Sequence, residues 1–385
     1  MKVAIICSNL YDLSEKTIKG TEIFIYDLIK NLNKYGKRDG LEYTVFCSGS
    51  SHLPFRIESL DRLPSSSDPQ IIANGKHIIF ELALISKAFA EQTEYDLFHV
   101  NIGDGDIVMP FTPFVNRPVL ITLHHIYNAD YTRKYFSFFR SQNNVYFVSI
   151  SDAQRRILPG LNYAATIHHG IDLQEYAFNP LGGKRIIWAG RMIPEKGPDI
   201  AIEVAEKTGQ EALLFGIVKK EHEQWIERQL LARVFPQKAD SRTRIEFNQP
   251  RSSLIPFIQD SRLFLFPISA EEAFGLVLIE ALASGTPVVA YARGAVPEIV
   301  QDGITGFLVN PSDEDVRGDW IIRKSGPAGL CEAVERITGM PEDQYQQMRR
   351  ACRAAVEEHF SIQRMIADYE NLYKELIQSC KQGGN

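Results

Sequence analysis

Residues 269–286 read S-A-E-E-A-F-G-L-V-L-I-E-A-L-A-S-G-T, and this stretch decides how its part of the chain folds. An apolar run precedes it at residues 263–267, and a second follows it at residues 287–291. Short apolar runs bounded by turn residues are typical of buried strands, and the longer apolar stretch between them favours a helix. We therefore predict a strand, loop, helix and strand of a parallel α/β sheet, with the loop at the carboxyl edge where such sheets bind ligands.

Two kinds of polar group lie on this predicted loop and helix. Phe274, Gly275 and Leu276 open the helix, so their backbone N–H groups and the helix dipole favour an anion. Glu272 and Glu280 carry carboxylates, which repel phosphate but accept hydrogen bonds from vicinal hydroxyls. Together they predict a ligand with phosphate in the middle and hydroxyls at both ends, which is a nucleotide-diphosphate sugar.

Length and composition limit the classes of protein that this chain can belong to. Its 385 residues are too many for one ordinary core and suit two α/β domains. A formal net charge of -6 gives no support for a nucleic-acid partner, which calls for a basic face. The five cysteines lack metal-site spacing, and no apolar run approaches the ~20 residues of a membrane span. We expect a cytoplasmic protein with no transmembrane segment, and we make no prediction of its oligomeric state.

Strands alternate with helices in two series, which predicts two Rossmann-like domains. The first series has predicted strands at residues 3–8, 43–47, 97–101, 119–123, 145–149 and 165–168, and predicted helices at residues 22–33, 76–90 and 153–158. The second series has predicted strands at residues 185–189, 212–215, 244–247, 263–266, 288–291 and 307–309. Neither first strand is followed by G-x-G-x-x-G, which argues against an NAD-linked oxidoreductase.

A pair of cations follows the first strand of the second series. Residues 190–198 read G-R-M-I-P-E-K-G-P, and the proline suits the first turn of a helix. Arg191 and Lys196 therefore project from a strand-to-helix loop, where helix N–H groups and two positive charges converge on one anion.

These motifs resemble those of the family 4 glycosyltransferases. The stretch E-A-F-G-L-V-L-I-E-A-L-A-S-G-T-P-V-V-A is similar to the family's E-x7-E motif, and G-R-x-x-P-E-K-G to its diphosphate-binding motif. The resemblance extends over essentially the whole chain. It implies a retaining enzyme of the GT-B fold, with two Rossmann-like domains facing across a cleft and a C-terminal helix that crosses back to the N-terminal domain.

The resemblance also implies an assignment of the domains. Residues 1–175 are expected to bind the acceptor, residues 176–358 to bind the nucleotide sugar, and residues 359–385 to pack on the N-terminal domain. The donor is expected to be a UDP-sugar, or else a GDP-sugar. The acceptor is a small molecule, a glycan or a lipid-linked compound, and no cofactor is expected.

Roles for single residues follow from the same resemblance. Arg191 and Lys196 are expected to stabilise the leaving diphosphate, assisted by the N–H groups at residues 274–276. Glu280 is expected to hold the ribose diol, and Glu272 the hydroxyls of the transferred sugar. Retention is expected to proceed by attack on the same face of the sugar, with help from the leaving phosphate.

Matches to the family in the first domain are weaker. Lys19-Gly20-Thr21-Glu22 looks like the family's glycine-rich loop with lysine in place of the first glycine, and Gly20 is expected to approach the donor closely. Thr122-Leu123-His124 matches a T-x-H motif that places His124 beside the transferred sugar. His99 matches a family strand and is as well explained as a hydrogen-bonded core residue.

Three acidic or unmatched stretches need separate interpretations. Asp104 and Asp106 form an Asp-x-Asp pair of the kind that can bind a divalent metal, but they lie far in sequence from the phosphate-binding loops, so no metal site is predicted. The acidic run at residues 313–315 is interpreted as a helix cap and a solvated face. Residues 316–324 have no match in the family and are interpreted as a local decoration.

Two alternatives of other classes remain open. A nucleotide-sugar 2-epimerase uses a similar scaffold but needs acid and base carboxylates that these motifs do not supply. A catalytically silent nucleotide-sugar sensor would keep the binding residues and lose only turnover.

Overall fold

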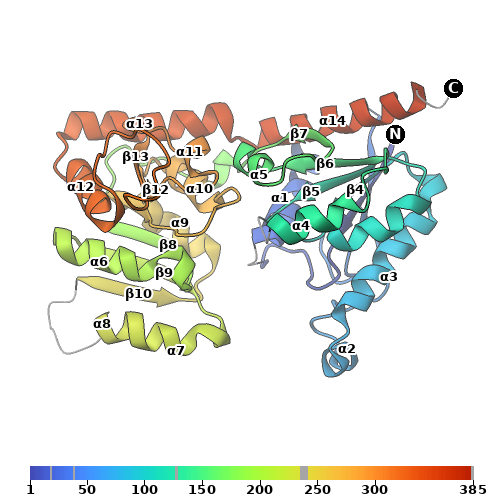
Figure 1. The fold of residues 1–385 in the computed structure, drawn as a ribbon, viewed down its shortest axis with the longest axis horizontal. Coiled ribbons are helices and arrows are strands. Elements are labelled where there is room, and N and C mark those ends of the chain that lie inside the picture. Colours follow the sequence, from blue (N-terminus) through green and yellow to red (C-terminus); the bar gives the residue numbers. More distant parts are fainter. Residues whose placement is uncertain (18–19, 38–39, 126–128, 235–241, 383–385) are drawn as a thin grey trace. The chain divides into compact units, whose positions relative to one another are not determined.

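The computed structural model describes residues 1–385 except 18–19, 38–39, 126–128, 235–241 and 383–385. It divides into two compact units, Met1–Gly170 with Ile362–Asn385 and Ile171–Ser361. Each unit is built on one parallel sheet covered by helices (Figure 1). The prediction of two Rossmann-like domains is therefore confirmed. Within the described residues, no helix has the length and apolar character needed to cross a membrane.

The first unit contains a seven-stranded parallel sheet in the order β3-β2-β1-β4-β5-β6-β7. Its strands are β1 (Lys2–Cys7), β2 (Glu42–Phe46), β3 (Arg56–Glu58), β4 (Leu97–Asn101), β5 (Val119–Leu123), β6 (Val145–Ser149) and β7 (Tyr163–Thr166). Its helices are α1 (Gly20–Tyr35), α2 (Pro69–Asn74), α3 (His77–Ala90), α4 (Ala129–Ser137), α5 (Asp152–Ile157) and α14 (Ile362–Gln382).

Both faces of this sheet are buried because successive side chains of a strand point to opposite faces. Val3, Ile5 and Cys7 of β1 pack in one core together with helices α1 and α14. Ala4 and Ile6 pack in the other core, with α3. The C-terminal helix α14 therefore belongs to the packing of the first unit, beside the N-terminal strand (Figure 1).

The second unit contains a six-stranded parallel sheet in the order β10-β9-β8-β11-β12-β13. Its strands are β8 (Ile186–Arg191), β9 (Ala212–Ile217), β10 (Thr243–Phe247), β11 (Leu263–Phe266), β12 (Val288–Tyr291) and β13 (Gly306–Val309). Its helices are α6 (Pro198–Thr208), α7 (Glu223–Ile226), α8 (Ala232–Val234), α9 (Arg251–Gln259), α10 (Leu276–Ala283), α11 (Val296–Ile299), α12 (Gly326–Thr338) and α13 (Glu342–His359). The direction of strand progression reverses between β8 and β11, which is the topological switch point of the sheet.

A buried arginine ties the start of the second unit to its core. The Arg349 side chain is fully buried. It donates to the backbone carbonyls of Asn179, Gln259, Ser261 and Ser284 at 2.7, 3.1, 3.0 and 3.2 Å. Four carbonyl acceptors satisfy a charge that would be costly to bury alone. The Pro- and Gly-rich stretch at residues 179–183 is therefore held against this unit.

The prediction of the first sheet needs two corrections. The last strand of the first sheet is Tyr163–Thr166, two residues before the predicted 165–168, because this edge strand is only half-buried and gives a weak apolar pattern. Strand β3 was not predicted, since its three residues Arg56–Glu58 carry two charges on a sheet edge.

Candidate functional site

Lys196 and Glu272 form an ion pair at the switch point. Lys196 ends a short 3-10 turn after β8, and Glu272 lies on the loop after β11. Because β8 and β11 are neighbours in the sheet, the two loops emerge side by side. Lys196 Nζ lies 2.5 Å from Glu272 Oε2, and the two side chains keep 18 and 14% of their surface exposed. The two predicted donor residues are therefore brought together at the ligand-binding edge of this sheet.

The backbones of the two loops are also fixed to each other. Gly197 has φ +66°, and a Cβ at this position would lie 2.3 Å from the carbonyl oxygen of Pro267, so only glycine fits. The backbone N–H of Ser269 donates to the Glu195 carbonyl at 2.9 Å. This packing fixes the positions of the Lys196 and Glu272 backbones relative to each other.

Helix α10 begins beside this pair, next to Glu272. Gly275 has φ +100°, and no side chain in the described part of the chain caps the helix at this end. The Phe274 side chain is buried and packs on Phe360 with ring centroids 6.0 Å apart, so the backbone, not the ring, faces the loop. A helix start of this kind, at Gly275 and Leu276, favours an anion.

Glu280 is buried on the same helix and has a partner that the sequence did not predict. Its Oε1 accepts two hydrogen bonds from Arg251, of which the one from Nε is 2.7 Å long. Arg251 Nη2 also donates to the Tyr176 hydroxyl at 2.9 Å. Arg251 begins helix α9 after β10, outside every motif, so only the fold could reveal it. This partner neutralises a carboxylate that is 4% exposed.

Arg191 is the last residue of β8 and is exposed. It lies five residues before Lys196 on the same loop, which places it at the same edge of the sheet. Among the described residues its side chain has no ion-pair partner, whereas the Lys196 side chain has one.

In the first unit the predicted residues occupy the first turn of α1 and the loop after β5. Gly20 opens α1 and is exposed, and Lys19 lies outside the described residues. His124 is 6% exposed, and its Nε2 lies 3.1 Å from Asn101 Oδ1. Since an amide oxygen only accepts, Nε2 carries the proton in this hydrogen bond. Burial, followed by the nearby histidines, holds the pKa of His124 well below its usual value, so the ring is neutral at physiological pH.

His99 is a core residue. Its Nδ1 lies 2.7 Å from the Tyr373 hydroxyl and its Nε2 lies 2.8 Å from the Thr122 hydroxyl. Burial lowers the pKa of His99 to about 3. Both ring nitrogens are satisfied inside the unit, which supports the structural interpretation of this residue.

The Asp-x-Asp pair is close-packed at the start of a 3-10 turn. Burial and then the charge of Asp106 raise the pKa of Asp104 to about 6. The Tyr131 hydroxyl lies 3.5 Å from Asp106 Oδ2. Within the described residues, no group of three or more His, Cys, Asp or Glu side chains could hold a metal ion.

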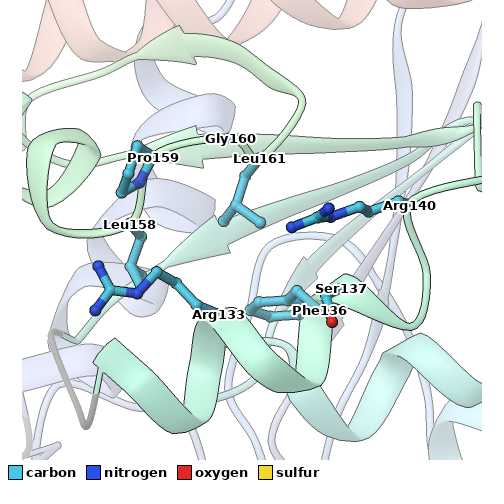
Figure 2. Close-up of a pocket in the computed structure, with 8 residues that line it drawn as sticks. All are labelled: Arg133, Phe136, Ser137, Arg140, Leu158, Pro159, Gly160 and Leu161. Carbon is cyan, nitrogen blue, oxygen red and sulfur yellow. The ribbon is translucent and has the colours of Figure 1, made fainter.

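A separate pocket of about 80 Å³ lies in the first unit beside α4, with Arg133 and Arg140 among its lining residues (Figure 2). The lining contains none of the predicted site residues. Pockets for drug-sized ligands measure about 300–1,000 Å³, so this one is too small for a nucleotide-diphosphate sugar.

The buried histidines of the first unit predict a pH-dependent stability. Burial lowers the pKa of both His99 and His169 to about 3. Below pH ~6.5 these histidines are protonated in the unfolded chain but stay neutral in the folded unit. The free energy of unfolding therefore falls by about 2 kcal/mol for each histidine at pH 5. Asp104, with a pKa raised to about 6, takes up a proton in the folded state and offsets about 1 kcal/mol of this loss.

Urea unfolding at pH 7.5 and 5.0 checks this expectation. All three tryptophans, Trp188, Trp225 and Trp320, lie in the second unit, so their fluorescence reports on that unit alone. We expect the circular dichroism transition to move to lower urea at pH 5.0 by more than the tryptophan transition. His99→Gln should reduce the difference, and equal shifts of both transitions would contradict the prediction.

The fold of this chain is similar to that of proteins of known structure. A sucrose-phosphate synthase from Thermosynechococcus elongatus superposes with a TM-score of 0.75 over 98% of this chain and 99% of its own, at 19% identity. The Anabaena protein Alr3699/HepE in complex with UDP and glucose superposes with a TM-score of 0.70 over 97% of this chain and 100% of its own, at 18% identity. The fold is therefore the GT-B fold of glycosyltransferases.

The family comparison falls on the unit that carries the Lys196–Glu272 pair. Residues 183–323 match the family described as Glycosyl transferases group 1. A D-inositol 3-phosphate glycosyltransferase from Mycobacterium sp. (strain KMS) is 32% identical over 184 residues, which cover 44% of this chain and 41% of the relative. The similarity to the glycosyl transferases group 1 family thus covers residues 183–323. The predicted family resemblance is therefore confirmed for these residues. The chain spans a third to two-fifths of the length of the curated relatives it matches.

Proposed function

We propose that the protein transfers a hexose from a nucleotide-diphosphate sugar to a hydroxyl group of an acceptor, with retention of configuration. The observation that carries this proposal is the pairing of Lys196 with Glu272 at the switch point, beside the open end of α10. A cation and the N–H groups of a helix start without a side-chain cap suit the diphosphate, and carboxylates suit hydroxyl groups.

Arg191, Lys196 and the N–H groups at residues 274–276 act on the leaving group in this proposal. As the bond between the sugar C1 and the diphosphate oxygen breaks, the electron pair passes to that oxygen. Fixed cations and helix N–H groups stabilise the charge that develops there. The acceptor oxygen bonds to C1 from the same face, and its proton passes to the departing phosphate.

Glu272 and Glu280 divide the hydroxyl groups of the donor between them. Glu272 pairs with the lysine at the phosphate position and is proposed to hold hydroxyls of the transferred sugar. Glu280 has one oxygen engaged by Arg251 and is proposed to use the other for the ribose diol.

The functional division of the chain is part of the proposal. Residues 176–358 bind the donor, and residues 1–175 bind the acceptor. Residues 359–385 pack on the acceptor-binding domain. His124 and Gly20 contribute to the reaction from the first domain. The acceptor is a small molecule, a glycan or a lipid-linked compound.

UDP-sugars are the first donors to test, and GDP-sugars the second. The Anabaena protein of the same fold binds UDP and glucose, and we carry this nucleotide to the present chain as the first candidate. A thermal-shift screen reveals the donor, because a ligand at 100 times its dissociation constant stabilises the folded state by about 2.7 kcal/mol.

Incubation with labelled nucleotide sugars then tests the reaction itself. A transferase releases free nucleotide together with a glycosylated acceptor or with slowly hydrolysed sugar. An altered sugar on intact nucleotide would indicate a 2-epimerase, and binding without turnover would indicate a silent sensor. Either of these two results contradicts the proposal.

His124→Ala is expected to lower transfer by about tenfold and to leave donor affinity nearly unchanged, because one hydrogen bond near the reacting sugar is lost. His99→Gln is the matched control, since His99 is equally buried but bonded inside the core. The control should lower the melting temperature and keep turnover per folded molecule. A His124→Ala variant that behaves like this control would show that His124 is structural.

A further inference from the structure

Four charged residues form a closed ring next to Glu272. Glu271 and Asp315 each contact both Arg293 and Arg317. Glu271 Oε1 lies 3.3 Å from Arg293 and 2.8 Å from Arg317, and Asp315 Oδ2 lies 2.5 Å from Arg293. Hydrogen bonds from Arg317, together with both arginine charges, lower the pKa of Asp315, so Asp315 keeps its charge at neutral pH. The acidic run at residues 313–315 is therefore not the predicted helix cap, because Asp315 is engaged in this ring and α12 begins only at Gly326.

The ring connects the loop after β11 to the segment 310–321, which we call the brace. This segment follows β13 and includes most of the stretch that had no match in the family. Asn310 organises it: its Oδ1 accepts from the backbone of Arg317 at 2.7 Å and from Trp320 Nε1 at 3.1 Å. Asp302 Oδ2 accepts from the Ile321 backbone at 2.7 Å. The brace therefore has a defined conformation of its own.

Backbone hydrogen bonds from one neighbouring segment hold both Glu271 and Glu272. The Gly294 N–H donates to Glu271 Oε2 at 2.7 Å, and the Ala295 N–H donates to the Glu272 carbonyl at 2.9 Å. Gly294 lies so close that a Cβ there would be 2.1 Å from the Glu272 carbonyl oxygen. The loop that carries Glu271 and Glu272 thus packs directly on residues 293–295, and Arg317 contacts the Glu271 carboxylate.

We propose that Arg317 and the brace are positioning elements for the donor site, which hold Glu272 through Glu271. This inference rests on the proposed function and adds residues that no motif contains. The carboxylate contacts of Arg317 in the described chain are with Glu271 and Asp315, not with Glu272. Arg317 fixes the carboxylate of Glu271, and thereby the loop from which Glu272 meets the sugar.

Three variants separate this role from a general loss of structure. Arg317→Ala removes the contacts of Arg317 with both carboxylates, whereas Arg317→Lys keeps a charge that cannot bridge them both. Arg323→Ala is the matched control, since Arg323 lies on the same connection and pairs only with exposed Asp319 among the described residues.

Amide hydrogen exchange of the peptide that contains Gly294 and Ala295 is the first measurement, and it needs no donor. Arg317→Ala is expected to speed exchange at these two amides, with a smaller effect in Arg317→Lys and none in Arg323→Ala. Unchanged exchange in Arg317→Ala overturns the inference. Failure of the wild-type protein to turn over any nucleotide sugar would instead contradict the proposed function.

Turnover supplies the second measurement. Arg317→Ala is expected to lower kcat about fivefold and to change the affinity for the free nucleotide little. A fivefold loss lies within the range of coupling between neighbouring residues. The same substitution in a Glu272→Gln background should have no further effect, because the brace acts through Glu272. An equal fivefold loss in both backgrounds would overturn the inference.

Discussion

Lys196→Ala is expected to lower donor turnover by at least about a hundredfold, since the loss of one preorganised group at a developing negative charge costs about 10²–10³ in kcat. The lysine is 18% exposed and lies at the switch point, and its removal also leaves Glu272 without its cation at the proposed phosphate position. Arg191→Ala should cause a similar loss. Steady-state kinetics with the donor found by the screen measures both effects.

Lys207→Ala is the matched control for these variants, because Lys207 is an exposed lysine of α6 that pairs with Glu203. It should retain full turnover. In Lys196→Ala/Glu272→Gln, nucleotide affinity should partly recover relative to Lys196→Ala, because the repulsion by an unpaired carboxylate is removed. Without that recovery, the paired geometry would have no electrostatic role in binding.

The same charges predict that activity persists in excess EDTA, and that Mg²⁺ does not rescue Lys196→Ala. A divalent metal and fixed cations are alternative ways to stabilise a leaving diphosphate. Loss of activity in EDTA with recovery on adding Mn²⁺, together with an inactive Asp104→Ala/Asp106→Ala variant, would show that metal binding by the Asp-x-Asp pair is the correct interpretation.

Central strands could be predicted from the sequence residue by residue because they are buried on both faces. The predicted strands at residues 97–101, 119–123 and 145–149 coincide with β4, β5 and β6, and those at 263–266 and 288–291 with β11 and β12. Edge strands lack this continuous apolar pattern, which is why β3 was missed and β7 was displaced.

The site could be predicted only as far as each local motif extends. Lys196 and Glu272 were both placed at carboxyl ends of strands, but their contact depends on β8 and β11 being neighbours, which sequence alone does not specify. Arg251 and Arg317 were missed because each contacts a motif residue from a distant loop or helix start. An exposed arginine on an unmatched segment looks the same in sequence whether it is solvated or paired.

Glu280→Gln is expected to weaken the binding of free nucleotide and of intact donor equally, by about tenfold to a hundredfold. Glu272→Gln should mainly reduce donor turnover. The reason is that ribose is present in both ligands and the transferred sugar only in the donor. Each lost hydrogen bond to a charged group costs about 1.5–3 kcal/mol. Calorimetric titration with the free nucleotide and with the nucleotide sugar measures the two affinities.

The Arg251 contact decides which substitution is informative at Glu280. Alanine would leave a partly buried arginine without its counter-charge and would destabilise the second unit, and breaking a buried pair costs about 3–5 kcal/mol. Glutamine keeps the volume and one acceptor oxygen for Arg251, so the folded fraction should stay high and tryptophan fluorescence can verify it. Arg251→Gln is the complementary variant: it keeps the carboxylate proposed to bind ribose but leaves it buried without its counter-charge, so the second unit should be less stable than in Glu280→Gln. If Glu272→Gln weakened free nucleotide as much as Glu280→Gln does, the proposed division of ribose and sugar between the two glutamates would be wrong.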